Sequence, residues 1–243
     1  LDASTALPVQ SGDVSISWSG SDAVQNNGQI APNFDGKQEI ALKATLSSGG
    51  QKLEKEFQCL LFGRDAVYVQ SYTRNTSGDM VNKLARSMFL AFSENGRDNF
   101  EALNDDYGIL FMRAKSAENG VLTPKGLKHP YLFYTKDGKY GVVAVRTAEN
   151  GSADPAKASS VMFYTSEDLV NYDEVGFVDL HTKASVNEPV CEYDPNAGVY
   201  RIRWNDGAGN YFQNTLPDIQ AGSQASEPQG TLPVSIRRVQ MGL

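Results

Sequence analysis

The chain has 243 residues, with 29 acidic and 22 basic side chains and a net charge of -7 at neutral pH. Such an acidic protein is not built to neutralise nucleic-acid phosphates, and it is equally unsuited to an anionic membrane surface. No run of residues is long and apolar enough to span a bilayer. Aromatic residues make up 10% of the chain and 22 residues are glycine, a mixture typical of short strands joined by turns.

The two cysteines, Cys59 and Cys191, each fall within a predicted strand. Buried free thiols are the simpler interpretation, and a disulfide between them is the alternative. With two histidines and no His/Cys cluster, the sequence predicts no zinc site and no cofactor. The chain starts at Leu1 without Met and shows no signal-like segment, so we expect a processed or trimmed chain.

Residues 1–62 are predicted to form a small all-β domain. Residues 13–20, DVSISWSG, alternate apolar and polar side chains as a half-buried strand does. Three more strands follow, with turn signals at Asn27-Gly28, Asp35-Gly36 and Gly49-Gly50. We expect a β-sandwich whose small core is filled by Trp18, Ile40, Leu42 and Phe57.

Three features of this segment carry a family resemblance: Ser17-Trp18-Ser19, the turn from Gly28 to Pro32, and the stretch ALKATLSSGGQKLEKEF. By these features it resembles the reduced immunoglobulin-like domains that precede catalytic modules in bacterial polysaccharide-degrading proteins. In those proteins the domain is a spacer or a packing partner. The resemblance therefore implies no chemistry for residues 1–62.

From residue 63 to 243 the sequence predicts units of short antiparallel strands and an irregular C-terminal tail. The first unit, about residues 66–114, opens with the strand AVYVQSYTR and continues with LARSMFLAFSENG. The second, about 127–182, opens with YLFYT and YGVVAVRT, joined by a hairpin turn at 136–139. The third, about 186–215, contains EPVCEYD and VYRIRWND around a turn at 195–198.

These units repeat one another. FLAFSEN at 89–95 matches MFYTSED at 162–168, and PYLFYTKDGKYGVVAV at 130–145 matches PVCEYDPNAGVYRIRW at 189–204. A period of about 60 residues, with four antiparallel strands each, is typical of propeller blades. A plain β-sandwich with coincidental hairpins is the alternative.

Four stretches in order carry a second resemblance: LARSMFLAFSENG followed by NFEALN, LKHPYLFYTKDGKYGVVAVRT, YTSEDLVNY, and EPVCEYDPNAGVYRIRWND. By these stretches the segment from Val67 to Trp204 resembles the five-bladed propellers of family-43 glycoside hydrolases. The resemblance implies a pocket on the propeller axis. It also implies inverting hydrolysis by two carboxylates about 6.5–9.5 Å apart, one a base toward water and one an acid toward the leaving oxygen.

The family's Arg-Asp-Pro pattern falls on residues 128–130, so His129 stands where the catalytic aspartate would be. Its imidazole could act as a base near neutral pH or hydrogen-bond a sugar hydroxyl. In the third unit Glu188 precedes Pro189, whereas the family's carboxylate follows the proline. Glu188 could face the axis or lie in solvent at a strand end. Glu188 and His129 are the catalytic candidates.

Side chains near the ends of the predicted strands complete the expected site. Tyr72 and Arg74 end the first inner strand, and Trp204 is either a sugar platform or inter-blade core. Because successive strand residues point to opposite faces, about half of these side chains can face the axis. The substrate-binding candidates are Tyr72, Arg74, Lys128, Tyr131, Arg203, Trp204 and Asp206.

The whole chain is predicted to be an all-β, carbohydrate-acting protein that is secreted, periplasmic or at the cell surface. The resemblance implies a family-43-type glycosidase for arabinose- or xylose-containing polysaccharide, or part of one. The alternative is a non-catalytic glycan-binding or structural module packed against a catalytic domain, which His129 in place of aspartate favours.

Three units at most leave the propeller axis open. We therefore expect the remainder of the propeller to come from a further segment or a second chain, or the propeller to close in some other way. The polysaccharide is the other expected partner, and neither nucleic acid nor membrane is expected. No metal is required, although the resemblance allows a cation on the axis.

Overall fold

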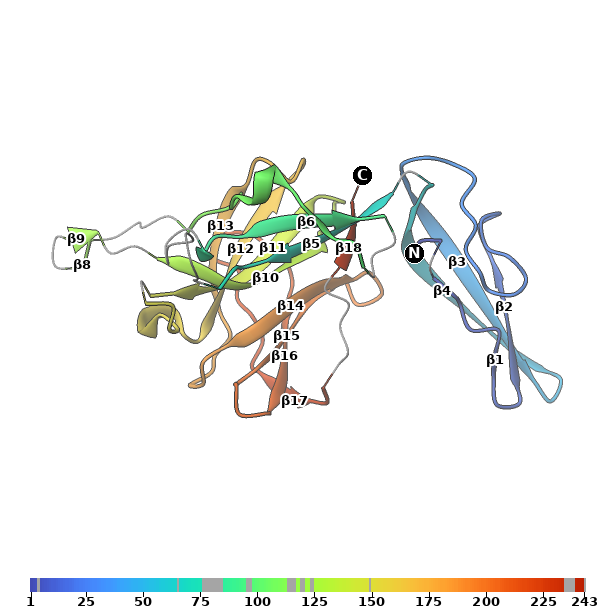
Figure 1. The fold of residues 1–243 in the computed structure, drawn as a ribbon. Helices are drawn as coiled ribbons and strands as arrows, with labels where there is room; N and C mark the ends of the chain where they lie inside the picture. Colours follow the sequence, from blue (N-terminus) through green and yellow to red (C-terminus); the bar gives the residue numbers. More distant parts are fainter. Residues whose placement is uncertain are drawn as a thin grey trace. The chain divides into compact units, whose positions relative to one another are not determined.

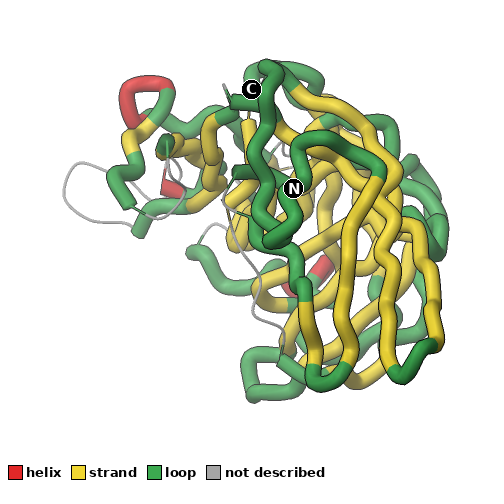
Figure 2. Tube along the Cα trace, turned by 90° about the vertical axis from the view of Figure 1, so that its right-hand side faces the viewer, coloured by secondary structure: helices red, strands yellow, loops and turns green. Residues whose placement is uncertain are grey.

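The computed structural model describes residues 1–3, 5–64, 66–75, 85–94, 98–112, 117–118, 121–122, 125–148, 150–233 and 239–242. Parts of the predicted first unit (76–84, 95–97 and 113–114) and of the predicted tail (234–238) lie outside these residues. The all-β prediction is confirmed: strands dominate the described chain, and its helical pieces are short (Figure 2). Within the described residues, no helix has the length and apolar character needed to cross a membrane.

The chain divides into two compact units, Leu1–Val67 with the last residues of the chain, and Tyr68–Gln240. The first unit is an antiparallel meander of four strands in sequence order (Figure 1). Gly49 and Gly50 both have positive φ and form the two-residue turn between the long strands, as their sequence predicts. The strands are β1 (Gln10–Ser11), β2 (Val14–Ser19), β3 (Lys37–Ser48) and β4 (Gln51–Phe62).

One face of this sheet carries the expected core residues. The register pairs Trp18 with Ala44 and Leu42 with Phe57, so these side chains share a face. The loop at 20–36 supplies apolar partners for Leu61, among them Ala23 and Ile30. Within the described residues the second layer is thus this irregular loop, where the sandwich prediction places a second sheet.

The second unit contains two complete four-stranded antiparallel meanders. A buried apolar cluster joins them, in which the ring of Phe133 makes edge contacts with Phe163 and Tyr200 at centroid distances of 6.2 and 6.3 Å. The first sheet is β10 (Gly126–Tyr134), β11 (Tyr140–Thr147), β12 (Ser160–Ser166) and β13 (Asp173–Asp179). The second is β14 (Asn187–Asp194), β15 (Val199–Asn205), β16 (Tyr211–Leu216) and β17 (Gln229–Thr231).

A further four-stranded sheet has the order β18-β5-β6-β7. Its strands are β5 (Val67–Tyr72), β6 (Phe89–Ser93), β7 (Glu101–Ala102) and β18 (Val239–Gly242). The sequence repeat equates β6 with β12, so β5 corresponds to the second strand of a meander and β18 takes the first position. Strand β5, which ends at Tyr72, is therefore an interior strand of this sheet, because β18 from the far end of the chain lies beside it.

The remaining elements are short. They are the hairpin of β8 (Ala117–Glu118) and β9 (Val121–Leu122), and the 3-10 turns η1 (Asn104–Asp106) and η2 (Pro155–Lys157). Both cysteines are free, and burial raises the pKa of each thiol. Propeller blades are four-stranded antiparallel sheets, and the strands after β4 form three sheets of four strands besides the β8–β9 hairpin. Their arrangement around one axis stays a prediction.

Candidate functional site

The two catalytic candidates occupy equivalent and unusual backbone positions. His129 has φ of 52° and Glu188 has φ of 47°, and each directly precedes a proline. The strand register shifts at both places, between Lys128 and Tyr131 in β10 and between Asn187 and Val190 in β14. A left-handed residue inside a β-bulge is strained, and bulges of this kind re-aim side chains. We call these two positions the matched bulges.

The matched bulges lie at the same end of neighbouring sheets. At the other end, the Lys136 backbone N–H donates to the Tyr200 hydroxyl at 2.8 Å, and Tyr200 pairs with Tyr193 of β14. The C-terminal ends of β10 and β14 therefore meet, and both strands begin near their bulge. Because β10 and β14 pack beside each other (Figure 1), His129 and Glu188 lie at the same end of the unit.

The surroundings of the two side chains differ. The Glu188 carboxylate is exposed and accepts a hydrogen bond from Asn205 Nδ2 at 3.2 Å. His129 is half-buried, and the carbonyl of the following Pro130 accepts a buried bond from Ser71 Oγ at 3.0 Å. Ser71 thus bonds strand β5 to the bulge at His129, while Glu188 in the other bulge is exposed to solvent.

Two of the predicted sugar-binding residues are core residues. Trp204 is 2% exposed and stacks on Phe212 at 4.6 Å between ring centroids, and Tyr131 is 6% exposed. Both belong to the cluster between the two meanders. Neither ring offers a face to a ligand, so both are removed from the candidate site. Trp204 fits the inter-blade core interpretation.

Tyr72 and Arg74 are both engaged with Asp106. The Tyr72 hydroxyl donates to Asp106 Oδ1 at 3.0 Å, and Arg74 forms an ion pair with the same carboxylate. Burial and then the Asp106 hydrogen bond raise the pKa of Tyr72 to about 12. In the sequence, Asp105 and Asp106 are adjacent, which argues against a catalytic pair. The contact of Asp106 with Tyr72 and Arg74 could not be predicted, because it joins the turn η1 to a distant part of the chain.

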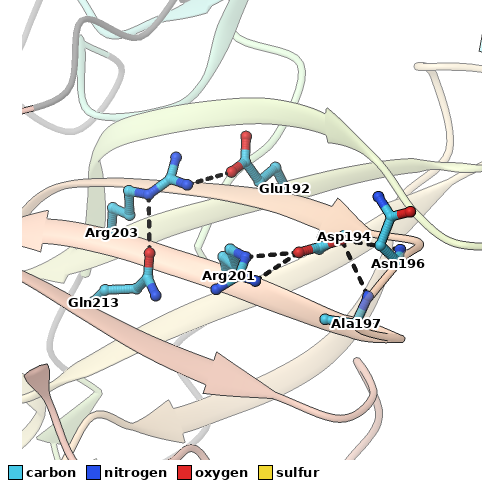
Figure 3. Close-up of polar contacts among 7 residues, drawn as sticks. All are labelled: Glu192, Asp194, Asn196, Ala197, Arg201, Arg203 and Gln213. Carbon is cyan, nitrogen blue, oxygen red and sulfur yellow. Dashed lines mark hydrogen bonds and ion pairs between the residues drawn. The ribbon is translucent and has the colours of Figure 1, made fainter. Parts of the chain in front are cut away.

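Arg203 lies in a polar network on the face of the β14–β17 sheet opposite Trp204 (Figure 3). Its Nη2 is 2.5 Å from Glu192 Oε1, and its Nε donates to Gln213 Oε1 at 3.1 Å. Beside it, Arg201 pairs with Asp194 at 2.6 Å. The alternation of residues 200–205, YRIRWN, could have indicated this polar face.

Lys128 and Asp206 complete the predicted set. Lys128 is exposed beside the first bulge. The Asp206 carboxylate accepts bonds from the backbone N–H groups of Ala208 and Asn210, at 2.8 and 3.1 Å, and from Asn210 Nδ2 at 2.6 Å. The Asn210 side-chain bond and then the Ala208 bond lower the pKa of Asp206. Asp206 therefore holds the turn between β15 and β16.

The described side chains gather no group of three or more His, Cys, Asp or Glu residues that could hold a metal ion. No protein-family model matches the chain, and a search of curated proteins finds no match to it.

The strain at the matched bulges can be tested by stability measurements. Glu188→Gly is expected to raise the free energy of unfolding by about 1 kcal/mol and Glu188→Val to lower it by at least as much, because the left-handed conformation penalises a Cβ. Glu192 lies in the regular part of the same strand and is the control. There glycine is expected to destabilise more than valine. Urea denaturation gives the free energy of unfolding of all four variants. If glycine and valine ranked in the same order at positions 188 and 192, the backbone at Glu188 would not be strained.

Proposed function

We propose that this chain acts on carbohydrate, with the matched bulges presenting His129 and Glu188 to the sugar. The observation that carries the proposal is the equivalence of the two positions. Each side chain precedes a proline, lies in a left-handed bulge, and is found at the same end of two neighbouring sheets. Strained backbone of this kind gathers at functional sites. The family-43 resemblance supports the choice of ligand, because its catalytic aspartate also precedes a proline.

The proposed reaction is glycoside hydrolysis of the family-43 type, on arabinose- or xylose-containing polysaccharide. His129 accepts a proton from the attacking water as its oxygen bonds to the anomeric carbon, and Glu188 donates a proton to the leaving oxygen as the glycosidic bond breaks. On this proposal, the chain works outside the cytoplasm, where such polysaccharides occur.

A non-catalytic glycan-binding role is the second candidate. The exposure of Glu188 favours it, because the catalytic acids of glycosidases typically lie in buried apolar pockets. In this role, His129 and Glu188 hydrogen-bond the sugar hydroxyls.

The experiment is hydrolysis of aryl arabinofuranosides, aryl xylosides and arabinan by the wild type, His129→Ala, Glu188→Gln and Glu167→Gln. Removing a general acid or base typically lowers rates by about 10²–10⁴-fold. We expect that loss in the first two variants and no loss in Glu167→Gln, which changes an exposed turn carboxylate. A wild type no faster than buffer would refute hydrolysis.

The binding role is tested on the same four proteins by calorimetric titration with arabinan oligosaccharides. Weaker binding by His129→Ala and Glu188→Gln, without hydrolysis by the wild type, is the result expected for the second candidate. Equal affinity in all four proteins would refute a sugar contact at the matched bulges.

A further inference from the structure

The N-terminal unit contains a hollow of about 610 Å³, within the size range of ligand sites. It lies where the loop at 20–36 crosses the core face of the sheet, at the end of β2 and the start of β3. We call it the N-terminal groove. Its lining includes Ser19, Asp22, Asn33, Phe34, Gln38 and Ile40.

Both walls of the N-terminal groove are held in place by the backbone. A Cβ on Gly20, whose φ is 111°, would lie 2.1 Å from the carbonyl oxygen of Ala41, so only glycine allows the chain to leave the sheet here. The two halves of the loop are joined by the Ala31 N–H donating to the Ala23 carbonyl at 2.7 Å. On the other wall, the Arg64 N–H donates to the Phe34 carbonyl at 2.9 Å. A ligand would meet a preformed surface.

Ser21 in the lining accepts a hydrogen bond from the Ala23 N–H at 3.2 Å, but the other polar side chains of the groove have their hydrogen-bonding capacity unused. Across the described residues, the side chains of Ser19, Asp22, Asn33 and Gln38 make no hydrogen bond or ion pair. Two amides, a hydroxyl and a carboxylate supply both donors and acceptors. Sequence position alone would not bring them together, because they come from two strands and two parts of a loop.

The lining also selects a class of ligand. Phe34 and Ile40 are half-buried, so they form an apolar patch beside the polar groups. None of the described residues that line the groove is cationic, which disfavours phosphates and acidic peptides. An aromatic plane bordered by neutral amides and a hydroxyl suits a ligand with many hydroxyl groups and apolar C–H faces.

We propose that the N-terminal groove binds a neutral oligosaccharide. This site lies in a different unit from the matched bulges and does not depend on their function. It gives the N-terminal unit, for which the sequence predicts no chemistry, the role of a separate glycan-binding module.

The test is an NMR titration of the full ¹⁵N-labelled chain with arabinohexaose, xylohexaose, cellohexaose and maltohexaose. At least one of these probes is expected to shift the amide signals of residues 19–23 and 33–40 in a saturable manner. Asn33→Ala combined with Gln38→Ala removes two hydrogen bonds, and about tenfold weaker binding is expected. No shift in these residues with any of the four probes would overturn the proposal.

Two sets of control variants show whether binding is specific to the N-terminal groove. Lys37→Ala and Glu39→Ala flank Gln38 but lie on the opposite face of β3, and both are expected to bind within about twofold of the wild type. Glu188→Gln is expected to leave these shifts unchanged, whatever it does to hydrolysis. Equal binding by the wild type and the Asn33/Gln38 double variant would also overturn the proposal.

Discussion

Replacing Asn214 with leucine is expected to lower the free energy of unfolding by about 3–5 kcal/mol. Asn214 lies in β16 with 0% exposure, and three groups depend on its amide. Its Oδ1 accepts from Trp204 Nε1 at 2.8 Å, and its Nδ2 donates to the carbonyls of Leu180 at 3.1 Å and Ser226 at 2.7 Å. Leucine has a similar volume but leaves all three without this partner, at about 1–3 kcal/mol for each group that stays buried.

Asn214→Asp tests the direction of the bonds at this position. It keeps an acceptor for Trp204 but turns an oxygen toward two carbonyl oxygens, so we expect a loss comparable to that of leucine. Gln213→Leu is the control, because Gln213 is half-buried on the opposite face and bonds only Arg203 among the contacts above. Urea denaturation should show a loss of about 1 kcal/mol or less for it. If Asn214→Leu also lost no more than about 1 kcal/mol, the hydrogen bonds of Asn214 would not stabilise the fold as expected.

The strands of this chain could be predicted because their signals are local. Between β10 and β11, the Thr135 N–H donates to the Lys139 carbonyl at 2.9 Å and Gly138 has φ of 77°, as the predicted hairpin at 136–139 requires. Between β14 and β15, the Gly198 N–H donates to the Asp194 carbonyl at 2.8 Å. Turn chemistry within a few residues decides such elements.

Strand partners over long distances could not be predicted in the same way. The pattern at 239–242 permits a strand, but nothing local indicates that it lies beside β5. The loop at 20–36 covers a sheet without any hydrophobic period, because single residues such as Ala23 and Ile30 supply its apolar contacts. Periodicity reports which face is buried and leaves the covering element undetermined.

In the candidate site, too, sequence motifs could be identified and tertiary contacts could not be predicted. His129 and Glu188 are candidates because they fall on proline-containing motifs of the family-43 resemblance. Their left-handed backbone could not be predicted from the sequence, because a residue before proline ordinarily adopts extended backbone with negative φ. The burial of Trp204 and the engagement of Tyr72 with Asp106 depend on residues from other elements. Residue type suggests what a side chain can do, and tertiary contacts decide whether it remains available.

Asp154→Asn is expected to lower the free energy of unfolding at pH 7 by about 3–5 kcal/mol, as breaking a buried ion pair typically does. The Asp154 side chain is 3% exposed, and its Oδ2 lies 2.6 Å from Arg146 Nε and 3.2 Å from Lys125 Nζ. Its Oδ1 accepts from the Ala156 N–H at 3.1 Å at the start of η2. Asparagine leaves two largely buried cations without a counter-charge and weakens the attachment of the segment 150–158 to β11.

The effect should depend on pH with a definite sign. Burial acts to raise the pKa of Asp154, but the Ala156 hydrogen bond and the two cations bring it below its ordinary value. The stabilisation is therefore complete above the unfolded pKa of about 3.9 and is lost as pH falls through the lower folded pKa. The difference between wild type and Asp154→Asn, measured by urea denaturation, should be full at pH 7 and shrink below about pH 4.

Glu167→Gln is the matched control for this measurement. Its partner Lys139 lies 2.8 Å away, but the two side chains are 77% and 43% exposed. A screened surface pair contributes about 0–1 kcal/mol, so the loss at pH 7 should be no larger. If Asp154→Asn and Glu167→Gln lowered stability equally, or if the Asp154 difference persisted unchanged at pH 3, the buried carboxylate would not be what holds the loop.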